Sequence, residues 1–120
     1  MSESYRIQEV NELIGQQLAQ ILTREISLRP GVFITVVKVD TSRDLRYSRV
    51  SVSIFPEQDR AYGLKTLQRE LYRIQKALNK QLVMHPLPRI MFELDVTESQ
   101  ATEVEKIIET IHRDDQEKRT

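Results

Sequence analysis

Apolar residues recur at helical spacing in three stretches of the chain. Over Arg6–Glu25 they stand three or four positions apart and form one buried stripe of Ile7, Val10, Ile14, Leu18, Ile21 and Leu22. Ser4 is a candidate N-cap for this helix. A long helix is predicted over Asp59–Leu82, with a core stripe of Leu64, Leu67, Leu71, Ile74, Leu78 and Leu82. The last helix is predicted over Glu98–Ile111, packed through Ala101, Val104, Ile107, Ile108 and Ile111.

Three shorter segments have the residue types and the period of two that are typical of strands. Val32–Asp40 is β-branched nearly throughout and apolar on both sides, which predicts a central strand. Tyr47–Phe55 alternates valine and isoleucine with Arg49, Ser51 and Ser53, which favours a half-solvated antiparallel partner. Arg89–Asp95 is predicted as a third strand, with inward side chains at Ile90, Phe92 and Leu94.

Turn residues separate these elements. Arg29-Pro30-Gly31 should end the first helix, Thr41–Leu45 should turn the chain, and Pro56 should end the second strand. Met84–Pro88 is a connector with two prolines. The order is therefore α-β-β-α-β-α, which predicts an α/β fold of the α+β kind, with one three-stranded sheet packed against helices. The 120 residues predict a single domain over residues 1–112 and a charged, flexible tail over residues 113–120.

Composition excludes several classes of function. The chain has no cysteine, which excludes disulfides, thiolate zinc sites and cysteine nucleophiles. No apolar run approaches the roughly 18 residues of a membrane helix, and the N-terminus does not resemble a secretory signal. The three glycines are far apart, so no glycine-rich phosphate loop is present. Neither His85 nor His112 belongs to a metal-spaced cluster. We therefore expect no enzymatic activity, no cofactor, no small-molecule substrate and no membrane partner.

Charge is distributed unevenly, although the net charge is zero. Residues 1–37 have a net charge of −1, residues 38–92 of +6, and residues 93–120 of −5. Because a local field steers an anionic partner, a neutral chain can still present a basic face.

Five cations of the predicted long helix fall on one face. At 100° per residue, Arg69, Arg73, Lys76 and Lys80 lie within roughly 80° of Lys65, opposite the apolar stripe. A solvated helix face usually mixes signs, because like charges at i, i+4 are slightly unfavourable, yet here such neighbours are all basic. We interpret this band as a site for a polyanion, and RNA is the expected one. An ordinary solvated face is the alternative.

Further candidates for RNA contact lie outside the helix. Arg43, Arg46 and Arg49 surround the turn between the first two strands, and His85 and Arg89 flank the prolines before the third. Each could equally be an ordinary surface residue. Asp44 is expected to cap backbone N–H groups of the turn.

Two residue patterns, in this order and at this separation, point to a family. They are Val37-x-Val39-x-Thr41-x-x-Asp44-Leu45-x-x-Ser48-x-Val50-x-Val52 and Leu82-x-Met84-His85-x-x-Pro88-x-Ile90-x-Phe92-x-x-Asp95. They resemble the first two strands and the third strand of the bacterial ribosome-binding factor A family, and the likeness covers residues 4–111. The resemblance implies a type II KH-like fold, α-β-β-α-α-β with an extra helix. It implies a non-catalytic factor that binds the immature small (30S) ribosomal subunit and its 16S rRNA late in assembly, in the bacterial cytoplasm or an organelle.

The sequence departs from that family where its second and third helices join. The family has an Ala-x-Gly kink there, and the corresponding positions here are Glu70-Leu71-Tyr72. Without the glycine, the segment could run as one straighter rod. His85 also replaces the usual arginine, and Ser48 the usual alanine.

A second class of function is compatible with the charge pattern. The predicted last helix has an acidic outer surface formed by Glu98, Glu103, Glu105 and Glu109. It could pair with the basic helix in a protein-interaction module or homodimer that does not bind RNA. We expect a monomer rather than a dimer. A small-molecule-binding or catalytic α/β domain is a third, weaker alternative, which would require a deep pocket lined by polar groups.

Overall fold

The computed structural model describes residues 3–83, 87–96 and 105–111. Several predictions lie outside these residues: His85 and His112, the connector residues 84–86, the start of the last helix at residues 98–104, and the tail at residues 113–120. In the described part of the chain, no helix is long and apolar enough to cross a membrane.

The described elements follow the predicted order. They are α1 (Glu3–Glu25), β1 (Phe33–Thr41), β2 (Tyr47–Phe55), the 3-10 helix η1 (Glu57–Asp59), α2 (Arg60–Arg69), α3 (Leu71–Gln81), β3 (Arg89–Leu94) and a helix over residues 105–111. The predicted mixed fold with a three-stranded sheet is confirmed. Because α1 begins at Glu3, Ser4 lies inside the helix and the prediction that it is the N-cap is wrong.

The sheet has the order β1-β2-β3, with β1 antiparallel and β3 parallel to β2. The prediction of β1 as a central strand is wrong, because β2 is central and β1 is an edge. A β-bulge explains the misleading pattern, since the pairing register shifts between Val36 and Lys38. The extra residue reverses the alternation, so that Val36 turns inward before the bulge and Val39 after it. Val37, in the bulge, is half exposed.

The other two strands agree with their predicted patterns. Val50, Val52 and Ile54 of β2 are buried, while Arg49 and Ser53 face solvent. On β3 the buried side chains are Ile90, Phe92 and Leu94. Each strand therefore places one face on the core and leaves the other open.

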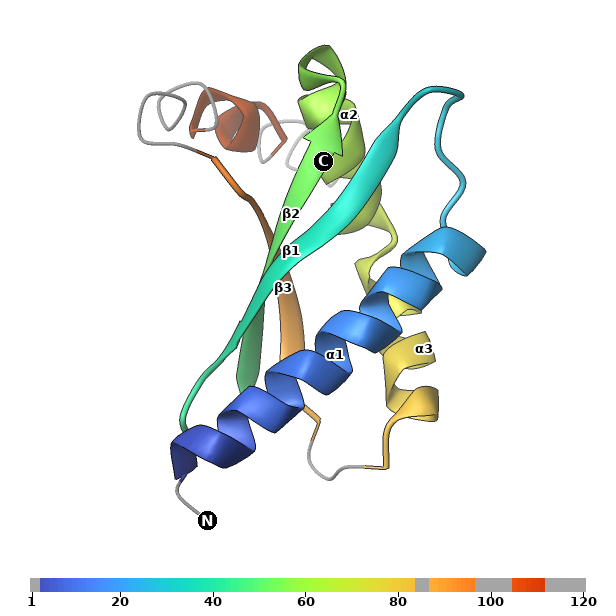
Figure 1. The fold of residues 1–120 in the computed structure, drawn as a ribbon. Coiled ribbons are helices and arrows are strands. Elements are labelled where there is room, and N and C mark those ends of the chain that lie inside the picture. Colours follow the sequence, from blue (N-terminus) through green and yellow to red (C-terminus); the bar gives the residue numbers. More distant parts are fainter. Residues whose placement is uncertain (1–2, 84–86, 97–104, 112–120) are drawn as a thin grey trace, which may run out of the picture.

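The helices cover one face of this sheet (Figure 1). Helix α1 packs along β1, α2 packs on β2 and β3, and α3 packs mainly against α1. The stripe predicted for α1 is confirmed: Ile7 is partly buried and the other five residues are buried. On α2 and α3 the buried residues include Leu64, Leu67, Ile74 and Leu78. The core therefore lies between the sheet and all three helices.

The predicted long helix is two helices, so the alternative of one straighter rod is wrong. The chain leaves helical geometry at Glu70, where φ is −94° and ψ is 7°. Hydrogen bonds continue across the break, from Glu70 N–H to the Thr66 carbonyl at 3.0 Å and from Ile74 N–H to the Glu70 carbonyl at 2.9 Å. The break lets α2 lie on the sheet while α3 follows α1 (Figure 1). Two packing partners in different directions therefore replace the glycine as the cause of the kink.

The connection from α1 to β1 contains the predicted turn. The Arg29 carbonyl accepts a hydrogen bond from Val32 N–H at 3.1 Å, and Gly31 has a φ of 86°. Proline followed by a residue with positive φ is the pattern of a type II turn. The Arg29 guanidinium also stacks 3.8 Å above the Tyr62 ring and pairs with Asp59 at 2.8 Å. The turn is thereby attached to the start of α2.

The described end of the last helix packs in part as predicted. Ile111 is buried and Ile107 is partly buried against the core. Ile108 is 37% exposed, so the prediction that it packs inward is wrong. The apolar face of this segment is narrower than the sequence pattern indicates.

Two helical glycines differ in the space around them, and this difference predicts opposite effects of alanine. A Cβ at Gly63 would lie 2.8 Å from two side-chain carbons of buried Ile54, whereas at Gly15 its nearest neighbour, a Val39 methyl, is 3.5 Å away. Gly63→Ala should therefore destabilise the protein by about 1–2 kcal/mol despite better helix propensity. Gly15→Ala, the matched control, should stabilise it by about 0.5–1 kcal/mol. Urea unfolding of both variants measures the difference, and a Gly63→Ala protein as stable as the wild type would contradict the packing described here.

Candidate nucleic-acid interface

The predicted cations of the long helix lie on two helices rather than on one straight face. Arg69 is in the last turn of α2, and Arg73, Lys76 and Lys80 are on α3. All four are exposed. Lys65 lies one turn before Arg69 in α2 and is partly buried. The kink at Glu70 therefore bends the basic band that helical spacing predicts.

Four of these cations, Arg69, Arg73, Lys76 and Lys80, line two adjoining hollows. The first has a volume of about 250 Å³, lies beside the kink, and is lined by Glu25, Ile26, Ser27, Tyr62, Thr66, Arg69, Glu70 and Arg73. The second, also about 250 Å³, is lined by Arg24, Glu25, Arg73, Lys76, Ala77, Lys80 and Gln81. Because Glu25 and Arg73 line both hollows, this pair lies between them. We call the surface formed by Arg24, Arg69, Arg73, Lys76 and Lys80 the α1–α3 basic surface.

Among the residues that the structure describes, the arginine of the α1–α3 basic surface that pairs with carboxylates is Arg73. Arg73 pairs with Glu25 at 3.1 Å and, more weakly, with Glu70 at 3.9 Å. Within the described part of the chain, Arg69, Lys76 and Lys80 form no ion pair. Most of the positive charge on this surface is therefore available to an outside anion.

A second basic group gathers at the turn between β1 and β2. Arg43 and Arg46 are exposed on the turn, and exposed Arg89 begins β3 beside it, its N–H donating to the Arg46 carbonyl at 2.8 Å. We call these three residues the turn cluster. The turn and the C-terminal end of α3 lie at the same end of the molecule (Figure 1).

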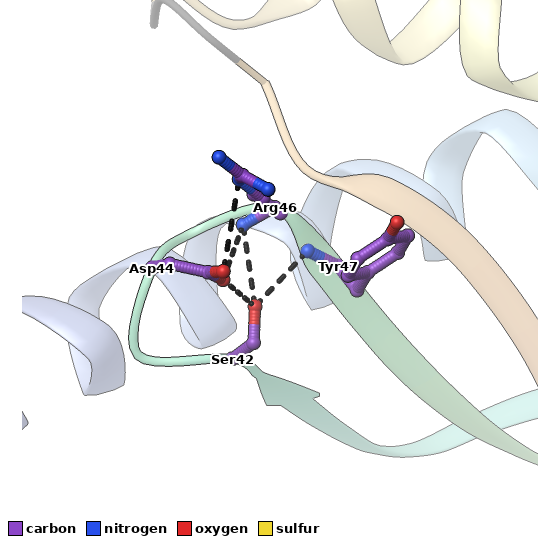
Figure 2. A network of polar contacts seen from close by, with 4 residues as sticks. All are labelled: Ser42, Asp44, Arg46 and Tyr47. Carbon is purple, nitrogen blue, oxygen red and sulfur yellow. Dashed lines mark hydrogen bonds and ion pairs between the residues drawn. The ribbon is translucent and has the colours of Figure 1, made fainter.

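Hydrogen bonds hold the turn in one shape (Figure 2). The Ser42 hydroxyl donates to the Asp44 carboxylate at 2.7 Å and accepts from the backbone N–H groups of Arg46 and Tyr47 at 3.2 and 3.1 Å. Asp44 also accepts from the Arg46 N–H at 3.2 Å, which confirms the predicted capping role. Leu45 has a φ of 59°, a conformation that such a local network must support.

Asp44 also affects the nearest arginine. Its carboxylate lies 3.7 Å from the Arg46 guanidinium. The Ser42 hydrogen bond, the Arg46 N–H and the Arg46 charge together lower the pKa of Asp44 below its ordinary value of 3.8. At neutral pH the carboxylate is therefore charged and offsets part of the positive charge of the turn cluster.

Arg49 is separate from both basic groups. It lies on the open face of β2, where Glu93 of β3 approaches its guanidinium to 3.6 Å and also accepts a hydrogen bond from Ser51 at 3.1 Å. This arrangement is that of a cross-strand ion pair, which weakens Arg49 as a candidate RNA contact. His85 lies outside the described residues.

Sequence reasoning missed three residues of the site. Arg24 and Glu25 reach the α1–α3 basic surface from α1, and no spacing in the sequence indicates that α1 and α3 are neighbours. The third is Gln75, whose amide accepts from Ile90 N–H at 2.9 Å and donates to the Pro88 carbonyl at 3.1 Å. Gln75 thereby joins α3 to the start of β3 and holds Arg89 in place. No spacing in the sequence indicates these hydrogen bonds, because they join α3 to a later segment of the chain.

Among the residues that the structure describes, no group of three or more histidine, cysteine or carboxylate side chains could hold a metal ion. What the geometry offers is a shallow, exposed and mainly basic surface on a mixed α/β scaffold. Such a surface is suited to binding a polyanion.

The chain is similar to known proteins in both sequence and structure. The family model of ribosome-binding factor A matches residues 6–108. Ribosome-binding factor A of Bdellovibrio bacteriovorus is 34% identical over 109 residues, which cover 90% of this chain and 81% of that protein. The crystal structure of ribosome-binding factor A from Thermus thermophilus superposes with a TM-score of 0.63 at 26% identity, covering 73% of this chain and 93% of that one.

A third match is a homology model of the Thermus thermophilus factor fitted into a cryo-EM map of its complex with the 30S subunit. It has a TM-score of 0.58 at 28% identity and covers 69% of this chain and 88% of that one. The described fold is thus that of a KH-like domain. The chain belongs to the ribosome-binding factor A family.

The hydrogen bond from Ser42 should be the main cause of the lowered pKa of Asp44. In Ser42→Ala the pKa of Asp44 should rise toward 3.8, because the largest stabilising contact of the carboxylate is removed. The stability that the lowered pKa contributes is complete above pH 3.8 and is lost as pH falls through the folded-state value. An NMR pH titration of Asp44 measures this, with Ser53→Ala as a control on the open sheet face. An unchanged pKa in Ser42→Ala would contradict the network in Figure 2.

Proposed function

We propose that this protein is a non-catalytic assembly factor that binds the immature 30S subunit and its 16S rRNA during late maturation, in the bacterial cytoplasm. Membership of the family supports the ribosomal role. The complex with the 30S subunit described for the Thermus thermophilus factor supports the choice of subunit. The fold supports nucleic-acid binding, since KH domains bind RNA through its backbone.

The observation that carries the proposal is the α1–α3 basic surface. Arg69, Lys76 and Lys80 are exposed and lack ion-pair partners among the described residues, and together with Arg24 they surround two adjoining hollows. Lysine and arginine side chains that contact phosphates release condensed counterions, which supplies most of the affinity for RNA. An exposed surface lined mainly by basic side chains suits contact with a phosphate backbone.

The remaining candidate residues differ in how much they are expected to contribute to RNA binding. Lys65 extends the surface along α2, and Arg73 contributes once its own carboxylate partners are displaced. Arg43, Arg46 and Arg89 of the turn cluster provide a second contact at the same end of the molecule as the C-terminal end of α3. Arg49 and His85 are the weakest candidates. Acidic side chains of the last helix, including exposed Glu105 and Glu109, keep RNA contact away from that segment.

Removal of three charges tests this assignment. The triple variant Arg69→Gln, Lys76→Gln and Lys80→Gln should bind a 16S rRNA transcript at least roughly tenfold more weakly and co-sediment poorly with 30S subunits. The slope of log K against log salt concentration should become shallower by about 2–3, because three phosphate contacts are lost. The side chains are exposed, so circular dichroism and urea unfolding should match the wild type.

A matched control removes three exposed cations elsewhere, in the variant Arg6→Gln, Lys38→Gln and Lys106→Gln. This control has the same net charge as the triple variant and should retain most of the affinity. Equal loss in both variants would indicate a nonspecific effect of net charge and would contradict the proposed surface. If the triple variant keeps both RNA binding and subunit binding, the proposed surface is excluded. Salt-sensitive dimerisation, measured by light scattering, would then favour a protein-interaction module.

A further inference from the structure

The centre of the α1–α3 basic surface contains a carboxylate that comes from a distant part of the chain. Glu25 ends α1, and its side chain lies 3.1 Å from the Arg73 guanidinium. The contact with Glu70 is different, because it joins neighbouring turns and is longer, at 3.9 Å. Glu25 is therefore the stronger internal counter-ion of Arg73, and its position results from the packing of α3 on α1.

The hollow beside the kink has the groups that bind an oxyanion. Arg69 and Arg73, which carry guanidinium groups, line it together with Ser27 and Tyr62, which carry hydroxyls. The Tyr62 oxygen accepts the Arg29 N–H at 3.0 Å, which leaves its own hydrogen for a further acceptor. The volume of about 250 Å³ is several times that of a water molecule, about 30 Å³, so a phosphate group fits. The anionic groups lining this space are the chain's own Glu25 and Glu70.

Carboxylate and phosphate groups can compete for the same arginine side chain. A guanidinium presents parallel N–H donors that fit either anion. The Arg73 side chain is 60% exposed and that of Glu25 is 34% exposed, so solvent weakens their ion pair. A phosphate carried by a long RNA, held also at Arg69 and Lys76, can displace such a pair at little cost.

We propose that Glu25 occupies the phosphate position on Arg73 and acts as an intramolecular competitor of RNA. The carboxylate must turn away when the backbone binds, and its pairing with Arg73 reduces the affinity and the salt dependence of binding. This inference rests on the proposed function and concerns regulation of the same site. The proposal gives α1 the role of limiting the affinity for RNA. The other residue that α1 contributes to the interface is Arg24.

The test is the isosteric variant Glu25→Gln, compared with Glu12→Gln. Glu12 is exposed on the same helix and lines a different groove with Val37 and Lys38. Glu25→Gln should bind the 16S rRNA transcript about two- to fivefold more tightly at low salt, since a surface ion pair has an effect of that order. Its affinity should also fall more steeply with salt. Glu12→Gln should stay close to the wild type.

A double-mutant cycle with Arg73→Gln separates competition from a general charge effect. In the Arg73→Gln background, Glu25→Gln should no longer increase affinity, because no arginine remains to be released. Three results would overturn this inference but leave the proposed function intact. The wild type could bind RNA with no gain in affinity in Glu25→Gln. Alternatively, Glu12→Gln could gain as much affinity, or the gain in Glu25→Gln could persist in the Arg73→Gln background. Absence of RNA binding by both the wild type and Glu25→Gln would overturn the proposed function and this inference with it.

Discussion

The packing of α3 against α1 is the constraint on which the site depends. Helix α2 lies on the sheet, and the chain can reach α1 only by changing direction at Glu70. This change of direction forms the hollow beside the kink and brings Glu25 to Arg73. A straight helix over the same residues would keep its cations in one row but would lack the hollow and the internal counter-ion. The shape of the basic surface is therefore a consequence of core packing and not of helix propensity.

The cations of the candidate site are of two kinds, those with a nearby carboxylate and those without one. Arg46, Arg49 and Arg73 each have a carboxylate within 4 Å, and these contacts orient the guanidinium groups while offsetting their charge. Arg69, Lys76 and Lys80 have no such partner among the described residues, and in the proposed function they are the side chains that contact the RNA backbone. The zero net charge of the chain conceals this arrangement, because many of the acidic residues lie in other segments.

Much of the fold could be predicted from local patterns, and the exceptions have physical causes. The β2 strand has the bounds that alternation predicts, because one of its faces is buried and the other solvated. The β1 strand was misinterpreted because the bulge at Val37 places apolar residues on both sides of an edge strand. No glycine in the sequence indicates the kink at Glu70, because the kink results from tertiary packing. Likewise, the cations of the site were identifiable from helical spacing, whereas the contributions of Glu25 and Gln75 depend on contacts between distant segments.

In the proposed complex, the α1–α3 basic surface faces the rRNA and the open face of the sheet points away from it. Photo-crosslinking tests it most directly, with one photoreactive residue placed at Lys76 on α3 and, in a separate variant, at Ser53 on the open face of β2. Each variant would be bound to 30S subunits and irradiated, and the crosslinks to 16S rRNA would be quantified. The account predicts strong crosslinking from position 76 and little from position 53. Crosslinks mainly from position 53 would contradict it.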